Sequence, residues 1–130
     1  MGELKIVLVE DNEDTRVLLT LMLESEGYQV TGLEDGIDAL DIIKDSCPDA
    51  IITDLMMPGI DGLTFIQKAK ALHPAVPIVL LSGNGDIIKN DALNAGACKI
   101  FVKPFDSDEL LKTLRSLMLK HFERGADSGH

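Results

Sequence analysis

Residues 50–54 of the chain read Ala-Ile-Ile-Thr-Asp, an apolar run that ends in the carboxylate of Asp54. Three further apolar runs are also followed by charged or hydroxyl residues: residues 6–9 by Glu10 and Asp11, residues 78–81 by Ser82, and residues 100–102 by Lys103. If the four runs are parallel strands of one sheet, their carboxyl ends lie side by side and share one crevice. The pattern therefore predicts that three carboxylates, a hydroxyl and an ammonium group meet at one edge of a sheet.

Helix-like segments separate these runs, and the regular alternation of the two predicts an α/β fold with helices on both faces of the sheet. The runs at 6–9, 50–53, 78–81 and 100–102 are continuously apolar, as expected of parallel strands that are buried on both faces. A further run at 28–33 alternates apolar residues with Gln29 and Thr31, which is typical of an edge strand. Five strand–helix units are therefore expected.

Apolar residues at helical spacing predict the buried face of each helix. In the first helix, residues 15–26, that face is expected to carry Leu18, Leu21 and Met22. The other helices are expected at residues 36–45, from an Asp61 cap to about residue 73, at about 86–95, and at 107–122. The domain is then expected to span residues 1–124, and residues 125–130 to form a flexible C-terminal tail.

Length and charge exclude several classes of protein. A chain of 130 residues is long enough to form one domain without disulfides or a structural metal, and its two cysteines lack the short spacing of a zinc site. No apolar stretch approaches the roughly 20 residues that cross a bilayer, and no signal-peptide core is present, so a cytoplasmic location is expected. The net charge of −10 predicts no direct binding to nucleic acid or to anionic membranes.

The predicted cluster has the chemistry of a phosphoryl-transfer site. Mg²⁺ prefers a few carboxylate oxygens together with a substrate phosphate, and Glu10, Asp11 and Asp54 supply such carboxylates, with Mn²⁺ as an alternative ion. The cation would neutralise the repulsion between them and allow ionised Asp54 to act as a nucleophile. Lys103 would neutralise phosphoryl oxygens, and Ser82 could donate a hydrogen bond to one of them.

Four motifs give the chain its resemblance to a known family. They are 9–12 (Val-Glu-Asp-Asn), 54–62 (Asp-Leu-Met-Met-Pro-Gly-Ile-Asp-Gly), 82–83 (Ser-Gly) and 103–105 (Lys-Pro-Phe), in this order and at consistent spacing. Over residues 5–119 the chain resembles the receiver domain of two-component response regulators. The resemblance implies a flavodoxin-like, doubly wound fold, with a five-stranded parallel sheet of order 2-1-3-4-5 and helices on both faces.

The resemblance also implies the role of each site residue. Asp54 would accept a phosphoryl group from a sensor histidine kinase or a phosphotransfer protein, in a self-catalysed reaction followed by autodephosphorylation. Asp11, Asp54 and the backbone carbonyl of Met56 would hold the metal ion, and Glu10 would act mostly through water. Lys103 would bind the phosphoryl group, Ser82 would turn inward to meet it, and the Lys103–Pro104 bond would be cis.

In such a family phosphorylation switches the surface of the fourth helix, fifth strand and fifth helix. This surface would control a downstream effector protein or a detached output domain, with a phosphorylation-linked dimer as a further option. One position departs from the family pattern, because Ile100 stands where an aromatic switch residue usually lies, three residues before the lysine. Phe101 is one position away and should point to the opposite face of the strand.

The sequence argues against three alternative functions. A degenerate receiver would act as a phosphorylation-independent interaction module, but this chain retains every charged site group. A flavodoxin-like electron carrier would need a phosphate-binding loop after the first strand, where residues 10–14 are instead acidic. A phosphohydrolase with an aspartyl nucleophile would need a second acidic residue two positions after Asp54, where Met56 stands.

Overall fold

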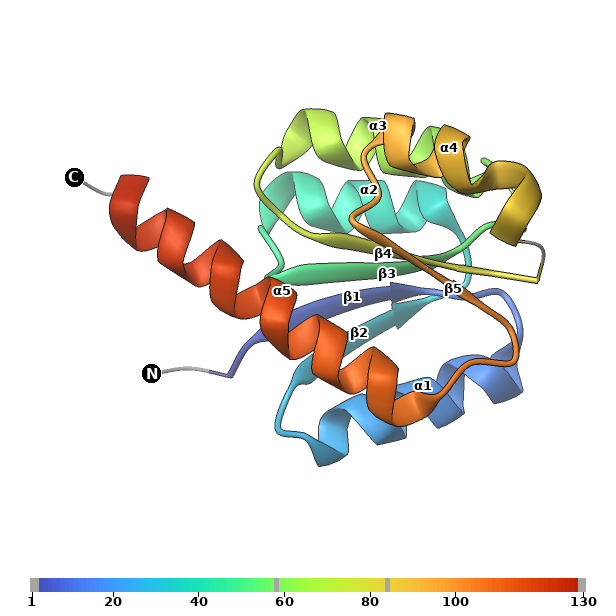
Figure 1. Cartoon of the computed structure of the whole chain (residues 1–130), viewed down its shortest axis with the longest axis horizontal. Coiled ribbons are helices and arrows are strands. Elements are labelled where there is room, and N and C mark those ends of the chain that lie inside the picture. Colours follow the sequence, from blue (N-terminus) through green and yellow to red (C-terminus); the bar gives the residue numbers. More distant parts are fainter. Residues whose placement is uncertain (1–2, 58, 84, 129–130) are drawn as a thin grey trace.

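The computed structural model describes residues 3–57, 59–83 and 85–128, with residues 85–88 and 122–128 described only as parts of their helices. Five strands and five helices alternate along the chain: β1 Lys5–Val9, α1 Glu13–Ser25, β2 Gln29–Leu33, α2 Gly36–Asp45, β3 Ala50–Asp54, α3 Gly62–Leu72, β4 Ile78–Ser82, α4 Gly85–Ala95, β5 Lys99–Val102 and α5 Ser107–Ser128. The strands are parallel and form one sheet of order β2-β1-β3-β4-β5 (Figure 1). The predicted flavodoxin-like topology is confirmed.

Helices cover both faces of this sheet. In Figure 1, helices α2, α3 and α4 lie over one face, and α1 and α5 lie over the other. Each face has its own apolar core: Phe65, Ile66 and Ile43 belong to the first, and Leu23 and Leu114 to the second. Successive side chains of each central strand point into one core and then the other. Both faces of these strands are therefore buried, which explains why their sequences are apolar without interruption.

The strand register brings the ends of the central strands to one edge of the sheet. Val9 lies opposite Thr53, Asp54 opposite Leu81, and Ser82 opposite Val102. Parallel strands must all end on the same side, so the residues that follow them are brought together by the backbone alone. The edge predicted to carry the functional groups is therefore formed as expected.

The prediction for the buried face of α1 was wrong for Leu18 and Leu21, although Met22 does pack against the core. Leu18 and Leu21 are 68% and 60% exposed, whereas Leu19 and Leu23 are buried against the sheet. Residues 17–23 are apolar except for Thr20, so helical spacing allowed either side of the helix to face inward. The structure leaves an exposed apolar surface on α1, formed by Val17, Leu18 and Leu21.

Two other predictions differ from the structure near the C-terminus. Strand β5 is an edge strand, and Val102 is 46% exposed, so this run is not buried on both faces. Phe101 is buried in the core beneath α5, and Ile100 packs against the core on the opposite face, as their alternation predicted. Helix α5 continues to Ser128, past residue 122, because a single glycine at position 125 costs only about 1 kcal/mol in a helix.

Helix α3 begins at the cap that the sequence predicted. The Asp61 carboxylate accepts hydrogen bonds from the Thr64 backbone N–H at 2.9 Å and from its hydroxyl at 3.1 Å. The bond from the Thr64 N–H is the main reason why the pKa of Asp61 lies below its ordinary value of 3.8. The ionised cap therefore stabilises the helix that directly follows the Asp54 loop.

Asp61→Ala is expected to lower the free energy of unfolding by about 1 kcal/mol at neutral pH, because it leaves helix N–H groups without their acceptor. A lowered folded-state pKa means that the carboxylate stabilises the fold above pH 3.8, and that this contribution is lost as the pH falls through the folded-state pKa. Denaturant unfolding of both proteins at several pH values measures this. If the difference in free energy of unfolding between the two proteins grew on acidification, the stabilising role of the ionised Asp61 carboxylate would be contradicted.

Candidate functional site

Three carboxylates from two strands form an acidic cluster at the carboxyl edge of the sheet. Glu10 and Asp11 follow β1, and Asp54 is the last residue of β3. One carboxylate oxygen from each can be chosen so that all three lie within 4.8 Å of one another. Glu10 and Asp54 are only 1% and 8% exposed, whereas Asp11 is exposed. The predicted meeting of these side chains is confirmed.

Lys103 reaches this cluster from the end of β5. Its Nζ lies 3.1 Å from Glu10 Oε1 and 3.2 Å from Asp54 Oδ2, so one ammonium group bridges two buried carboxylates. The Lys103 backbone N–H donates to the Ser82 carbonyl at 2.7 Å, and the Lys103–Pro104 peptide is cis, as the resemblance implied. The backbone of Lys103 is thus tied to β4, and its ammonium group is held between the carboxylates of Glu10 and Asp54.

The cluster carries more negative than positive charge. Burial raises the pKa of Glu10 above its ordinary value and the charge of Asp54 raises it further, although the Asn12 N–H and Lys103 act in the opposite direction. Burial also favours neutral Lys103, but its hydrogen bond to Glu10 and the charge of Asp54 outweigh burial and raise its pKa. Lys103 therefore stays charged, and one ammonium group faces three carboxylates.

Backbone groups hold the individual carboxylates in place. Asp54 Oδ1 accepts from the Leu55 N–H at 2.8 Å, which leaves Oδ2 directed toward Lys103. Glu10 Oε2 accepts from the Asn12 N–H at 3.1 Å, and the Asn12 side chain in turn caps α1 by accepting from the Thr15 N–H. The carboxylates of Glu10 and Asp54 are therefore held in defined orientations.

Ser82 and Met56, the other two predicted site residues, lie at the same edge. Ser82 ends β4 and is fully buried. Met56 lies two residues after Asp54, and its side chain is 74% exposed, so a role in the site would fall to its backbone carbonyl. Both residues lie at or just after the ends of β3 and β4, which are neighbours in the sheet.

One residue of this region was missed in the sequence. Arg16 Nη1 donates to the Glu10 carbonyl at 2.8 Å and approaches the Asp11 carbonyl at 3.5 Å. An arginine in the second turn of a helix has no sequence signal for such a role, because its acceptors are backbone carbonyls. The structure alone shows that it contacts the loop that carries two of the three carboxylates.

The donor set suits a hard divalent cation. Carboxylate and carbonyl oxygens are the ligands that Mg²⁺ prefers, and a small group of them normally leaves room for water or a phosphate oxygen. The excess negative charge around Glu10 gives a cation an electrostatic reason to bind there. The residues that meet at this edge therefore fit a Mg²⁺ site.

Comparison with known proteins gives the same family throughout. The sequence model of the response regulator receiver domain matches residues 6–115. Response regulator MprA of Mycobacterium sp. (strain KMS) is 35% identical over 126 residues, which cover 95% of this chain and 55% of MprA. Sporulation initiation phosphotransferase F of Bacillus subtilis (strain 168) is 30% identical over 115 residues, covering 88% of this chain and 93% of that protein. The chain thus spans about half the length of MprA and nearly all of the Bacillus protein.

Solved structures agree with the sequence comparisons. The receiver domain of sensor histidine kinase PA1611 from Pseudomonas aeruginosa PAO1, with a magnesium ion coordinated in its active site cleft, has a TM-score of 0.83 and 32% identity, covering 90% of this chain and 98% of that domain. Across the described part of the chain, no helix is long and apolar enough to span a membrane. Motifs, fold, site geometry and relatives together show that the chain belongs to the response regulator receiver domain family.

Proposed function

We propose that this receiver domain accepts a phosphoryl group on Asp54 in a reaction that depends on Mg²⁺, with Mn²⁺ as a substitute. The observation that carries the proposal is the placement of Asp54, which lies among the carboxylates of Glu10 and Asp11 with the Lys103 ammonium 3.2 Å from its Oδ2. A nucleophilic carboxylate, a set of metal ligands and a fixed cation are the parts that phosphoryl transfer requires.

The chain's own residues would carry the reaction as follows. A carboxylate oxygen of Asp54 attacks the phosphorus of a phosphohistidine, the N–P bond breaks, and its electron pair leaves with the imidazole. Lys103 shifts from the carboxylates to the incoming phosphoryl oxygens, and Ser82 donates a hydrogen bond to another of them. Glu10, Asp11, Asp54 and the Met56 carbonyl would hold Mg²⁺, which neutralises charge on the phosphoryl group. Hydrolysis of the aspartyl phosphate at the same site restores the starting state.

Incubation with acetyl phosphate and Mg²⁺ is expected to add one phosphoryl group to the chain, observed as a single mass increment by intact mass spectrometry. A chelator should remove the labelling, because the clustered carboxylates then repel the incoming anion. A degenerate receiver would give no labelling under either condition. That outcome would replace the proposed reaction with phosphorylation-independent binding.

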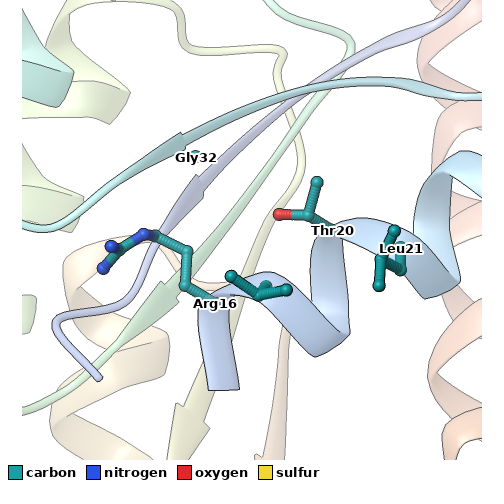
Figure 2. A pocket seen from close by; sticks show the side chains of 5 residues that line it. Arg16, Thr20, Leu21 and Gly32 are labelled. Carbon is teal, nitrogen blue, oxygen red and sulfur yellow. The ribbon is translucent and has the colours of Figure 1, made fainter. Parts of the chain in front are cut away.

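We propose that the phosphodonor is a sensor histidine kinase or a phosphotransfer protein, and that it docks on α1. Val17, Leu18 and Leu21 form an exposed apolar surface on α1. Two of them, Val17 and Leu21, line a pocket of about 260 Å³ together with Arg16, Thr20 and Gly32 (Figure 2). Arg16 links this pocket to the acidic loop through its bond to the Glu10 carbonyl. A donor seated there could present a phosphohistidine to Asp54.

Leu18→Asp is expected to slow transfer from a phosphohistidine donor about tenfold more than it slows labelling by acetyl phosphate. A charge within an apolar interface disrupts protein docking, whereas a small donor needs no such interface. The measurement compares both rates in each protein, with a histidine phosphotransfer domain that phosphorylates the wild-type chain as the donor. Equal slowing with both donors would place docking elsewhere.

We further propose that phosphorylation changes the surface formed by α4, β5 and α5. Ser82 ends β4, and Lys103 directly follows β5. Because the Lys103 N–H bonds to the Ser82 carbonyl, movement at the phosphoryl group would be transmitted to β5. The output would be a downstream effector protein or a separate output domain, through either a direct complex or a phosphorylation-linked dimer. The net charge of −10 favours protein partners over nucleic acid or membranes. We propose that these partners are met in the cytoplasm.

A further inference from the structure

The side chain of Arg16 connects helix α1 to the loop between β1 and α1. It donates to the Glu10 carbonyl at 2.8 Å and approaches the Asp11 carbonyl at 3.5 Å. The Glu10 backbone N–H is bound by the Leu33 carbonyl at 2.9 Å, and the Asn12 N–H by the Glu10 carboxylate at 3.1 Å. With Arg16, both backbone groups of Glu10 are held, and the peptide that joins the two acidic residues has a fixed orientation.

Gly32 on β2 provides the space through which Arg16 passes. A Cβ at position 32 would lie 3.4 Å from Arg16 Cγ and Cδ and 3.5 Å from Thr20 Oγ1, at the lower limit of ordinary contact. Figure 2 shows Arg16 leaving α1 beside this strand, with Gly32 opposite the helix. A methyl group just fits there, whereas a branched side chain would compete with the aliphatic part of Arg16.

We infer that Arg16, which passes over Gly32, is a positioning residue for the metal site: it orients the carboxylates of Glu10 and Asp11 for divalent cation binding. The inference rests on the proposed Mg²⁺-dependent function of the same site. Partners of metal ligands that lie outside the coordination shell commonly change metal affinity by 10–100-fold, because they hold the ligands in their binding geometry. Arg16 does so through the backbone rather than through the carboxylates.

Charge and geometry predict opposite effects for the loss of Arg16, which makes the inference testable. A guanidinium group near a cation site repels the cation, so its removal should tighten Mg²⁺ binding if charge alone matters. If Arg16 orients the loop, its removal should weaken Mg²⁺ binding despite the favourable change in charge. The sign of the change in affinity separates the two roles.

The experiment measures Mg²⁺ affinity by titration calorimetry, and amide hydrogen exchange by NMR in the metal-free protein. Arg16→Ala is expected to weaken Mg²⁺ binding about tenfold and to speed exchange of the Asn12 amide, which is bonded to Glu10 Oε2. Gly32→Val should also weaken Mg²⁺ binding and speed exchange of the Asn12 amide, although the charge is unchanged, because the valine methyl groups displace Arg16. Gly32→Ala should stay close to wild type in both measurements.

Arg115→Ala is the matched charge control. It removes an arginine whose side chain is 67% exposed and pairs with Glu26, beyond the opposite end of α1. It should leave both measurements unchanged. Arg16→Lys keeps the charge but loses the planar fork of donors, so it should also bind Mg²⁺ more weakly than wild type. Thermal unfolding of each variant verifies that the fold is retained.

The outcomes distinguish this inference from the proposed function. If the wild-type chain binds Mg²⁺ and Arg16→Ala binds it equally well or more tightly, the positioning role is overturned while the proposed function stands. If Gly32→Val binds Mg²⁺ like wild type, the passage over Gly32 is overturned. If the wild-type chain neither binds Mg²⁺ nor becomes phosphorylated, the proposed function itself fails.

Discussion

Asp54→Asn is expected to reduce phosphoryl-group incorporation to background and leave the fold intact. The amide of asparagine is not a nucleophile for phosphorus, and no other carboxylate of the cluster holds the same position: Glu10 is 1% exposed and paired with Lys103, and Asp11 lies on the exposed loop. The reaction with acetyl phosphate and Mg²⁺, read by intact mass, measures the loss. Labelling that persists in this variant would move the acceptor to another residue.

The same substitution is expected to raise the free energy of unfolding in the absence of divalent cations. It removes the charge of Asp54, which adds to the effect of burial in raising the pKa of Glu10. Asparagine Oδ1 can still accept from the Leu55 N–H, and Lys103 keeps its bond to Glu10 at 3.1 Å. A rise in stability together with lost labelling would show that Asp54 is retained for its chemistry at a cost to the fold.

Asp61→Asn is the matched control for this variant. It makes the same chemical change seven residues away, on an exposed carboxylate that caps α3, and asparagine serves equally well as a helix cap. We expect it to be phosphorylated like wild type. A parallel loss of labelling in both variants would point to a general effect of the changed charge rather than to a role specific to Asp54.

The sequence predicted the site edge well because strand ends obey a simple rule. Apolar runs mark buried parallel strands, and parallel strands must end at the same edge, so Glu10, Asp11, Asp54 and Lys103 could be brought together without knowledge of any side-chain contact. The strand order itself came from the resemblance, since several orders would bury the same runs. The bridging of two carboxylates by Lys103 was not predicted, because β4 separates β5 from β3 and the contact depends on the reach of the lysine side chain.

Other features depend on tertiary contacts that no local pattern contains. In α1, residues 17–23 offer apolar groups around most of the helix. Burial in the core shared with Ile6 and Leu8 of β1, rather than spacing, determines that Leu19 and Leu23 turn inward. Residues 100–102 of β5 are as apolar as the central strands, but the edge position of β5 leaves Val102 half exposed. The role of Arg16 requires that a helix, a strand and a loop meet, and each of them looks ordinary by itself.

Gly62→Ala is expected to lower the free energy of unfolding by about 3 kcal/mol, at the upper end of the usual cost of overpacking a buried site. A Cβ at position 62 would lie 2.7 Å from the Asp54 carbonyl oxygen and 2.8 Å from Leu55 Cα, and both are backbone atoms that cannot rotate away. Gly62 is buried, and its N–H bonds to the Leu55 carbonyl at 2.9 Å, so α3 begins directly against the end of β3. Denaturant unfolding measures the cost.

Phosphorylation should slow in Gly62→Ala even under conditions where the variant is fully folded, because the clash is relieved by moving the backbone of Asp54 itself. Gly83→Ala is the matched control at the same edge of the sheet: a Cβ there would meet nothing within 4 Å, so its stability should stay within about 0.5 kcal/mol of wild type. If Gly62→Ala proved as stable as Gly83→Ala, close contact between α3 and β3 would not be what positions Asp54. The position of Asp54 would then depend on the bonds of its carboxylate with Leu55 and Lys103 alone.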